Sequence, residues 1–137
     1  MVEMSEVTTQ DMFNTMVRHL IKQRVRSTQA DGYSCAYRGV DGTMCAVGVL
    51  IADEHYHADL ETNIASSSCV LAAVEASIKR GLTVGEVQLL CKMQSIHDYS
   101  WHDLKDKIRR MRNTARNFRL EMPDYSDIYQ EQAQWLK

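Results

Sequence analysis

The sequence predicts a mainly α-helical protein, a single-domain bundle of about five helices with a small β-hairpin or loop near residues 33–44. Three observations support this class. The chain of 137 residues suits one domain and has only one proline and six glycines, so helix-breaking residues are few. Apolar residues recur at intervals of three and four along most of the chain. Typical N-cap residues precede several of these stretches.

The first predicted helix spans residues 9–26. The preceding Thr-Thr-Gln-Asp sequence at residues 8–11 is typical of a helix N-terminus. The apolar positions that follow have helical spacing and are Met12, Phe13, Met16, Val17, Leu20, Ile21 and Val25. Residues 27–32 are polar and lose this period, and residues 33–44 contain two glycines and a turn-like Val-Asp-Gly sequence, so the hairpin or tight loop is expected there.

The apolar run at residues 45–56 predicts a buried helix rather than a strand. Its small residues Ala46, Gly48 and Ala52 would let a neighbouring helix approach closely. A polar connection is expected to follow at residues 57–68.

Two more helices follow this connection. Residues 66–68 are serines that can cap the first, which Gly81 ends. Its apolar positions are Val70, Leu71, Val74 and Ile78. Thr83 and Glu86 have the spacing of a capping box and begin the second, which is expected to end near His97.

The last predicted helix begins where Ser100 and Asp103 repeat the cap spacing. Its apolar positions step by three and four, as in a helical packing seam, and are Trp101, Leu104, Ile108, Met111, Ala115 and Phe118. Pro123 ends the regular pattern. The chain therefore divides into a helical domain at residues 1–122 and an acidic, aromatic C-terminal tail at residues 123–137, which docks on the domain or remains mobile.

The 16 basic and 18 acidic residues give a formal net charge of -2, which argues against a general polyanion-binding protein. Residues 103–119 nevertheless contain seven basic and two acidic side chains. This face suits contact with nucleic-acid phosphates, docking on an acidic protein, or a solvated surface balanced by the acidic tail. The candidate partner-binding residues are Arg109, Arg110, Arg112 and Arg116, with the tail aromatics Tyr125, Tyr129 and Trp135.

The sequence also indicates a cellular location. No apolar run approaches the ~20 residues that a membrane helix needs, and the polar, acidic beginning of the chain is unlike a signal peptide. We therefore expect a cytoplasmic protein that does not contact membranes. Its four cysteines are expected to be reduced, and no cofactor is predicted.

Three interpretations of the cysteines remain open. In the first, Cys45 is a thiol nucleophile at a helix N-terminus, which would favour its thiolate. His97, with Asp98 or His102, would supply the base and the group that orients it. Any chain with a few cysteines and histidines offers such a pairing, so the signal has low specificity.

In the second interpretation, zinc binds Cys35 and Cys45 together with His55, His57 or Cys91. The ten-residue interval between the first two differs from the close C-x-x-C pairs of structural zinc sites. His55 and His57 could ligate only from a loop, because residues two apart lie on different faces of a helix.

The preferred interpretation makes all four cysteines small buried hydrophobic residues and the surrounding motif a folding device. Gly39 and Gly42 would supply backbone angles that other residues resist, and Arg38 would be held by Asp53 or Glu54. The residues of this structural motif are Cys35, Tyr37, Arg38, Gly39, Gly42, Cys45 and Gly48.

Two stretches of the chain carry a family resemblance, namely residues 35–56 (CAYRGVDGTMCAVGVLIADEHY) and residues 89–98 (LLCKMQSIHD), with Trp101 downstream. They resemble an uncharacterised family of small bacteriophage and prophage proteins. The family shares a C-A-Y-R-G, G-x-x-C-A-V-G and I-H-D pattern, and the match covers roughly the first two thirds of the chain. Residues 59–80 look like an expansion relative to shorter members, and the acidic tail departs from the pattern.

The resemblance implies a phage gene product that acts in the host cytoplasm, and it supplies no activity. The expected function is non-enzymatic binding of a host or phage protein, which would modulate or inhibit a host or defence component. One alternative is a nucleic-acid-binding module that uses the basic helix at residues 103–119, and another is a cysteine-dependent hydrolase at Cys45 and His97. A homodimer contact through the last helix is a further alternative.

Overall fold

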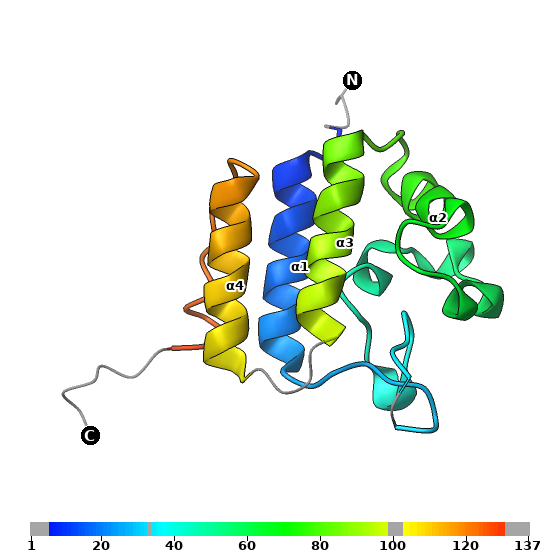
Figure 1. Ribbon diagram of the computed structural model, residues 1–137, viewed down its shortest axis with the longest axis horizontal. Helices are drawn as coiled ribbons and strands as arrows, with labels where there is room; N and C mark the ends of the chain where they lie inside the picture. The colour runs from blue at the N-terminus through cyan, green and yellow to red at the C-terminus, as the bar shows by residue number, and fades with distance from the viewer. Residues whose placement is uncertain (1–5, 33, 99–102, 131–137) are drawn as a thin grey trace.

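The structure, a computed structural model, describes residues 6–32, 34–98 and 103–130, which hold four α-helices. They are α1 (Thr9–Gln23), α2 (Ser68–Ile78), α3 (Val84–Asp98) and α4 (Leu104–Asn117). Helices α1, α3 and α4 contact one another and form a three-helix bundle, while α2 lies to one side of it (Figure 1). The predicted helical class is confirmed. No helix in the described part of the chain is both long and apolar enough to cross a bilayer.

Helix α1 is shorter than the sequence predicts. It begins with a capping box, in which the Thr8 hydroxyl accepts from the Asp11 N–H at 3.0 Å and the Asp11 carboxylate accepts from the Thr8 N–H at 2.9 Å. It ends at Gln23 because Arg24 has a left-handed backbone with φ 64°. Val25, a predicted core position, therefore lies outside the helix and is 60% exposed.

The chain between α1 and α2, residues 24–67, is called the linking segment here. It contains four short 3-10 helices: η1 (Val40–Gly42), η2 (Gly48–Leu50), η3 (Asp53–His55) and η4 (Ala58–Thr62). The predicted hairpin is not confirmed, because the described residues of this segment form only two isolated antiparallel bridges, Thr28 with Cys35 and Arg38 with Met44. Tyr33 lies outside the described residues.

The helix predicted at residues 45–56 is wrong, and the five-helix count is not confirmed. The run instead turns twice, as η2 and η3, and η2 packs between α1 and α2. A β-carbon on Gly48 would lie 2.1 Å from the carbonyl oxygen of Tyr37, so this backbone is pressed against another backbone and not against a helix. A short apolar run fits several buried conformations, and periodicity alone does not separate them.

Helices α2 and α3 follow their predicted boundaries closely. The residue that ends α2 is Lys79, whose backbone is left-handed with φ 63°, and not Gly81. The predicted capping box of α3 is confirmed: the Glu86 carboxylate accepts from the Thr83 N–H at 2.9 Å, and the Thr83 hydroxyl accepts from the Glu86 N–H at 3.1 Å.

Asp103 caps the N-terminus of α4, and its carboxylate accepts from the Asp106 N–H at 2.8 Å. Ser100 and Trp101, which the sequence assigns to its cap and seam, lie outside the described residues. After α4 the chain reverses direction at Arg119, where φ is 57°. Residues 118–130 then run back alongside α4 (orange to red in Figure 1) and are called the return segment.

Candidate functional site

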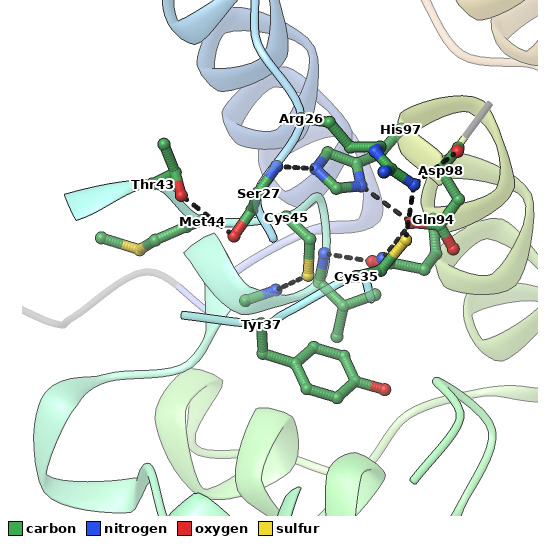
Figure 2. Close-up of polar contacts among 12 residues, drawn as sticks. Arg26, Ser27, Cys35, Tyr37, Thr43, Met44, Cys45, Gln94, His97 and Asp98 are labelled. Carbon is green, nitrogen blue, oxygen red and sulfur yellow. Dashed lines mark hydrogen bonds and ion pairs between the residues drawn. The ribbon is translucent and has the colours of Figure 1, made fainter. Parts of the chain in front are cut away.

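The I-H-D motif and the first cysteine meet at the C-terminal end of α3 (Figure 2). His97 is 1% exposed, and both of its ring nitrogens are bonded. Its Nε2 lies 2.9 Å from the backbone nitrogen of Ser27, and its Nδ1 lies 2.8 Å from Oδ1 of Asp98. Because a backbone N–H only donates, Nε2 is the acceptor and Nδ1 carries the proton that is donated to Asp98.

Asp98 is the acceptor of this cluster. Its Oδ1 also accepts from the Gln94 amide at 3.0 Å, and the Cys35 thiol bonds to it. Burial alone would raise the pKa of Asp98, but the hydrogen bonds from His97, Cys35 and Gln94 outweigh burial and lower it. The cluster is thus built around an ionised carboxylate.

The Cys35 thiol is protonated at neutral pH. Burial, strengthened by the neighbouring Asp98, raises its pKa to about 11. Arg26 opposes this rise, with its Nη1 at 3.5 Å from the sulfur. A thiol that donates to a carboxylate is the reverse of an activated thiolate.

Cys45 lacks the environment of a nucleophile. It is fully buried, its sulfur accepts from the Gly48 N–H at 3.2 Å, and burial raises its pKa to about 12. It does not begin an α-helix, so the predicted stabilisation of a thiolate by a helix N-terminus is absent. The ring nitrogens of His97 bond to Ser27 and Asp98 instead of to this sulfur, and His102 lies outside the described residues.

The other cysteine predictions have mixed outcomes. Cys45 is the buried small residue that the preferred interpretation describes, but Cys69 is exposed, so that interpretation is wrong for it. Cys35 and Cys91 are partly buried, and none of the four cysteines forms a disulfide. Within the described part of the chain, no group of three or more histidine, cysteine, aspartate or glutamate side chains is arranged to hold a metal ion. The described residues therefore provide no set of ligands for the predicted zinc ion.

The C-A-Y-R-G sequence is fixed by polar contacts. Arg38 binds Asp53, with Nη1 at 2.5 Å from Oδ1, and donates to the Ile51 carbonyl at 2.7 Å. Its guanidinium also lies over the ring of Tyr56, 4.8 Å from the centroid. Asp53 is thus the partner, rather than Glu54.

Glu61 is the residue of this region that sequence reasoning missed. One carboxylate oxygen accepts from the Tyr37 N–H at 2.9 Å, and the other accepts from the Arg38 N–H at 3.1 Å and from the Tyr56 hydroxyl at 2.5 Å. Burial, followed by the bond to Glu61, raises the pKa of Tyr56 to about 12. No local pattern connects a glutamate in a polar connection to a motif more than 20 residues earlier.

The two motif glycines have different roles. Gly42 has φ 74°, the left-handed conformation that the sequence argument expects. Gly39 has an ordinary φ of -101°, which corrects that expectation. Space is the constraint there, because a β-carbon would lie 2.5 Å from the Ser27 hydroxyl oxygen and 2.6 Å from the Thr28 carbonyl.

An open pocket of about 420 Å³ lies beside the His97 cluster, with Cys35, Glu61, Gln94 and Asp98 in its wall. Glu61 and Asp98 already accept hydrogen bonds from the protein, as described above. The Gln94 side chain accepts from the Val47 N–H at 3.2 Å and donates to Asp98. These polar groups hold the fold together.

The second candidate site is the solvent face of α4. Arg109, Arg112 and Arg116 are exposed, whereas Arg110 is half-buried and its Nε lies 3.0 Å from a carboxylate oxygen of Asp106. Arg109 pairs with the same aspartate. Four exposed cations follow one face of α4 and are Lys105, Arg109, Arg112 and Arg116; exposed Arg119 lies two residues beyond the end of the helix, and we call these five residues the cationic stripe.

The aspartates of the return segment do not cover this stripe. Asp127 forms a two-pronged ion pair with Arg18 of α1, at 2.7 and 2.8 Å. The Asp124 carboxylate accepts from the N–H and hydroxyl of Ser126, and its carbonyl accepts from Arg18 at 2.6 Å. The predicted balance of the basic helix by the acidic tail is therefore absent for both aspartates.

The tail aromatics are held against α1 and α4. The Tyr125 hydroxyl accepts from Arg112 at 2.9 Å, and the Arg24 guanidinium lies 5.3 Å from the ring centroid of Tyr129. Both tyrosines are half-buried and line an open groove of about 580 Å³, which we call the return groove. Trp135 lies outside the described residues.

Comparison with protein-family models, with curated proteins and with solved structures gives no match for this chain. Function therefore has to be argued from the site itself rather than from likeness. The resemblance to phage proteins stays a prediction.

Proposed function

We propose that this protein acts by binding, without catalysis, and that the cationic stripe of α4 binds nucleic acid. The observation that carries the proposal is the regular spacing of exposed Lys105, Arg109, Arg112, Arg116 and Arg119, at intervals of three and four residues. Such intervals place the first four on one side of α4, and Arg119 lies two residues beyond the end of the helix. The face is about 17 Å long between the first and fourth of these residues, from a rise of about 1.5 Å per residue.

Four of the five cations are arginines, which suits phosphate recognition. A guanidinium presents a planar fork of donors that matches two phosphate oxygens, whereas an ammonium acts as a point charge. Successive members of the stripe within α4 are about 4.5 to 6 Å apart along the helix axis, so neighbouring side chains can reach successive phosphates of one strand. The net charge of -2 does not oppose local binding of this kind, since charges beyond about 10 Å are screened at physiological salt.

The alternatives have less support. An acidic protein surface would also attract the stripe, but nothing in the described residues shows an apolar anchor among the exposed side chains of α4. The hydrolase hypothesis lacks an activated thiol, because burial raises the pKa of Cys45 to about 12. The phage resemblance extends the proposal by placing the nucleic acid in a host cell, where binding would modulate a host or defence process.

The test is binding of fluorescently labelled single-stranded and duplex oligonucleotides, measured by anisotropy over a series of salt concentrations. The variant Arg109→Gln, Arg112→Gln, Arg116→Gln is compared with a control that removes the same charge elsewhere, Lys22→Gln, Lys79→Gln, Lys92→Gln. The three control lysines are exposed and lie outside α4.

We expect affinity to fall steeply with salt in the wild-type protein and in the control. The arginine variant should bind at least about tenfold more weakly, and its slope of log K against log salt should be shallower by about 2, since three phosphate contacts are removed. Equal loss in the two variants, or salt-independent binding, would overturn the proposal. A nuclease-resistant acidic protein that requires the stripe, with no oligonucleotide binding, would move the partner to protein.

A further inference from the structure

The return groove joins the cationic stripe at Arg112. This side chain lines the groove, together with Met122 and the two tyrosines Tyr125 and Tyr129. It also lines a second hollow of about 320 Å³ on the same helix, with Arg109 in its wall. A strand whose phosphates follow the stripe therefore passes the mouth of an aromatic groove.

The rings in the groove are held before any ligand arrives. Arg112 fixes the hydroxyl of Tyr125 at 2.9 Å. Arg24 donates to the Ile128 carbonyl at 3.0 Å and lies over the ring of Tyr129, which holds that ring in place. Rings whose rotamers are already set lose little conformational entropy when a ligand stacks on them.

The chemistry of the groove suits a flat, partly polar ring. Its wall combines the two tyrosines with the thioether of Met122, the ring of Pro123, the guanidinium of Arg112 and the polar residues Asp124, Ser126 and Gln130. Its volume of about 580 Å³ is within the range of small-molecule sites. Every nucleobase has a π-face that stacks on an aromatic side chain, which is how proteins hold single strands without reading their sequence.

We infer that the nucleic acid bound by this protein is single-stranded, and that one of its bases enters the return groove and stacks against Tyr125 and Tyr129 while Arg109, Arg112 and Arg116 hold the adjacent phosphates. This inference rests on the proposed function. In a duplex the bases are paired and stacked on one another, and a base reaches a pocket beside the helix only after it has been unstacked, which costs free energy. A single strand avoids most of that cost.

The test compares three probes of the same length, about 12 nucleotides: a single strand, its duplex, and an abasic strand that has the phosphates but no bases. The single strand should bind about tenfold or more tightly than the abasic strand and the duplex, because stacking of one base is worth about that much. The double variant Tyr125→Leu, Tyr129→Leu should lose this preference. The matched variant Tyr125→Phe, Tyr129→Phe should keep it, because the rings remain.

Binding of the abasic strand separates the two proposals. If the abasic strand binds with a steep salt dependence but no more weakly than the base-bearing strand, the base pocket is refuted and the cationic stripe stands. If no probe binds in a salt-dependent manner, the proposed function itself fails. Equal behaviour of the leucine and phenylalanine variants would also refute the base pocket.

A second measurement on the wild-type protein removes any dependence on how the variants fold. A single strand that carries a halogenated pyrimidine is photocrosslinked to the protein, and the modified residue is located by mass spectrometry. Crosslinks should map to Tyr125 or Tyr129. Crosslinks confined to residues outside the return segment would overturn the inference.

Discussion

The three-helix bundle and the linking segment are stabilised in opposite ways. In the bundle, the backbone groups of α1, α3 and α4 bond within each helix, and the apolar faces supply the contacts between helices. In the linking segment, the backbone–backbone bonds of short turns are joined by bonds from backbone N–H groups to side chains, most of which lie outside the segment. These pairs are Ser27 with His97, Tyr37 and Arg38 with Glu61, Met44 with Gln23, Val47 with Gln94, and Ala52 with Ser77.

This difference shows that irregular backbone can be buried when distant polar side chains take over the role of helical hydrogen bonds. It also predicts where the protein is fragile. Substitutions in the linking segment should remove bonds that no neighbouring residue replaces, whereas most substitutions on the helices should be tolerated.

The largest effect is expected at Gly48. In Gly48→Ala, the new β-carbon would lie 2.1 Å from the Tyr37 carbonyl oxygen, and two backbone segments would have to separate. We expect a loss of more than about 4 kcal/mol in the free energy of unfolding, or failure to fold, measured by chemical denaturation.

Gly85→Ala is the control for this substitution, because it lies on the exposed surface of α3 with no atom nearer than 3.9 Å to the added carbon. It should stabilise the protein by about 0.5 to 1 kcal/mol, since alanine favours a helix over glycine. Similar destabilisation by both substitutions would contradict the contrast between the two regions.

The second effect tests a place where the bundle also depends on a long-range polar cluster. Glu86 is 3% exposed and accepts from Arg80 at 2.6 and 2.9 Å and from the Thr9 hydroxyl at 2.7 Å. Glu86→Gln should lower the free energy of unfolding by about 3 kcal/mol, because it removes the nearer and more buried of the two carboxylates that pair with the Arg80 guanidinium. Glu54→Gln, on an exposed residue, is the control and should change it by less than about 0.5 kcal/mol.

The ion pair between Arg80 and Glu86 also predicts that the stability of the protein depends on pH. The hydrogen bond from Arg80 lowers the pKa of Glu86 from its ordinary 4.5 to about 2. The unfolded chain therefore binds this proton first, and the contribution of Glu86 to stability is complete above about pH 4.5 and is lost as the pH falls towards 2. Between these values, the stability of Glu86→Gln should fall less steeply than that of the wild-type protein, and parallel curves would contradict this.

The third effect returns to the linking segment. In Glu61→Gln, one of the two carboxylate oxygens becomes an NH₂ group, which cannot accept a hydrogen bond. Either the bond from the Tyr37 N–H or the bond from the Arg38 N–H is therefore lost. The loss of a charged acceptor should lower the free energy of unfolding by about 2 kcal/mol. Glu75 accepts a hydrogen bond from the Leu82 N–H, so Glu75→Gln would not be a neutral control. Asp59→Asn, at an exposed residue of η4, is the better control and should differ from the wild type by less than about 0.5 kcal/mol.

The same contrast explains how much of the fold could be predicted from the sequence. The start of helix α1 and the capping box at Thr83 and Glu86 depend on residues within a few positions of one another, and both are where the sequence predicts them. The prediction of a helix at residues 45–56 was wrong, because the conformation of this run is set by contacts with Tyr37, α1 and α2. No window of local sequence contains that information.

The candidate sites divide in the same way. The cationic stripe is a periodic feature of one helix, so its residues could be named from the sequence. The predicted pairing of Cys45 with His97 could not be judged from the sequence, because it depends on which groups the two ring nitrogens of His97 bond. The return groove was also out of reach, since it requires the chain to reverse at Arg119 and place Tyr125 beside Arg112.

The smallest effect on stability is expected from a substitution in α2. It tests a single hydrogen bond between this helix and the linking segment. The Ser77 hydroxyl accepts from the Ala52 N–H at 2.8 Å and so joins this helix to the linking segment. Ser67 is the N-cap of the same helix, but its side chain makes no cap hydrogen bond. Ser77→Ala should therefore lower the free energy of unfolding by about 1 kcal/mol, whereas Ser67→Ala should lower it by less than about 0.5 kcal/mol.

Thermal and urea denaturation of the two serine variants decide between two accounts of the linking segment. If its stability comes from bonds to distant side chains, Ser77→Ala is the more harmful change, even though Ser67 occupies the position at which serine usually matters more to a helix. If Ser67→Ala proves the more harmful, α2 depends chiefly on its own cap. The linking segment would then be held by apolar packing against α1 and α2, with its polar bonds contributing little.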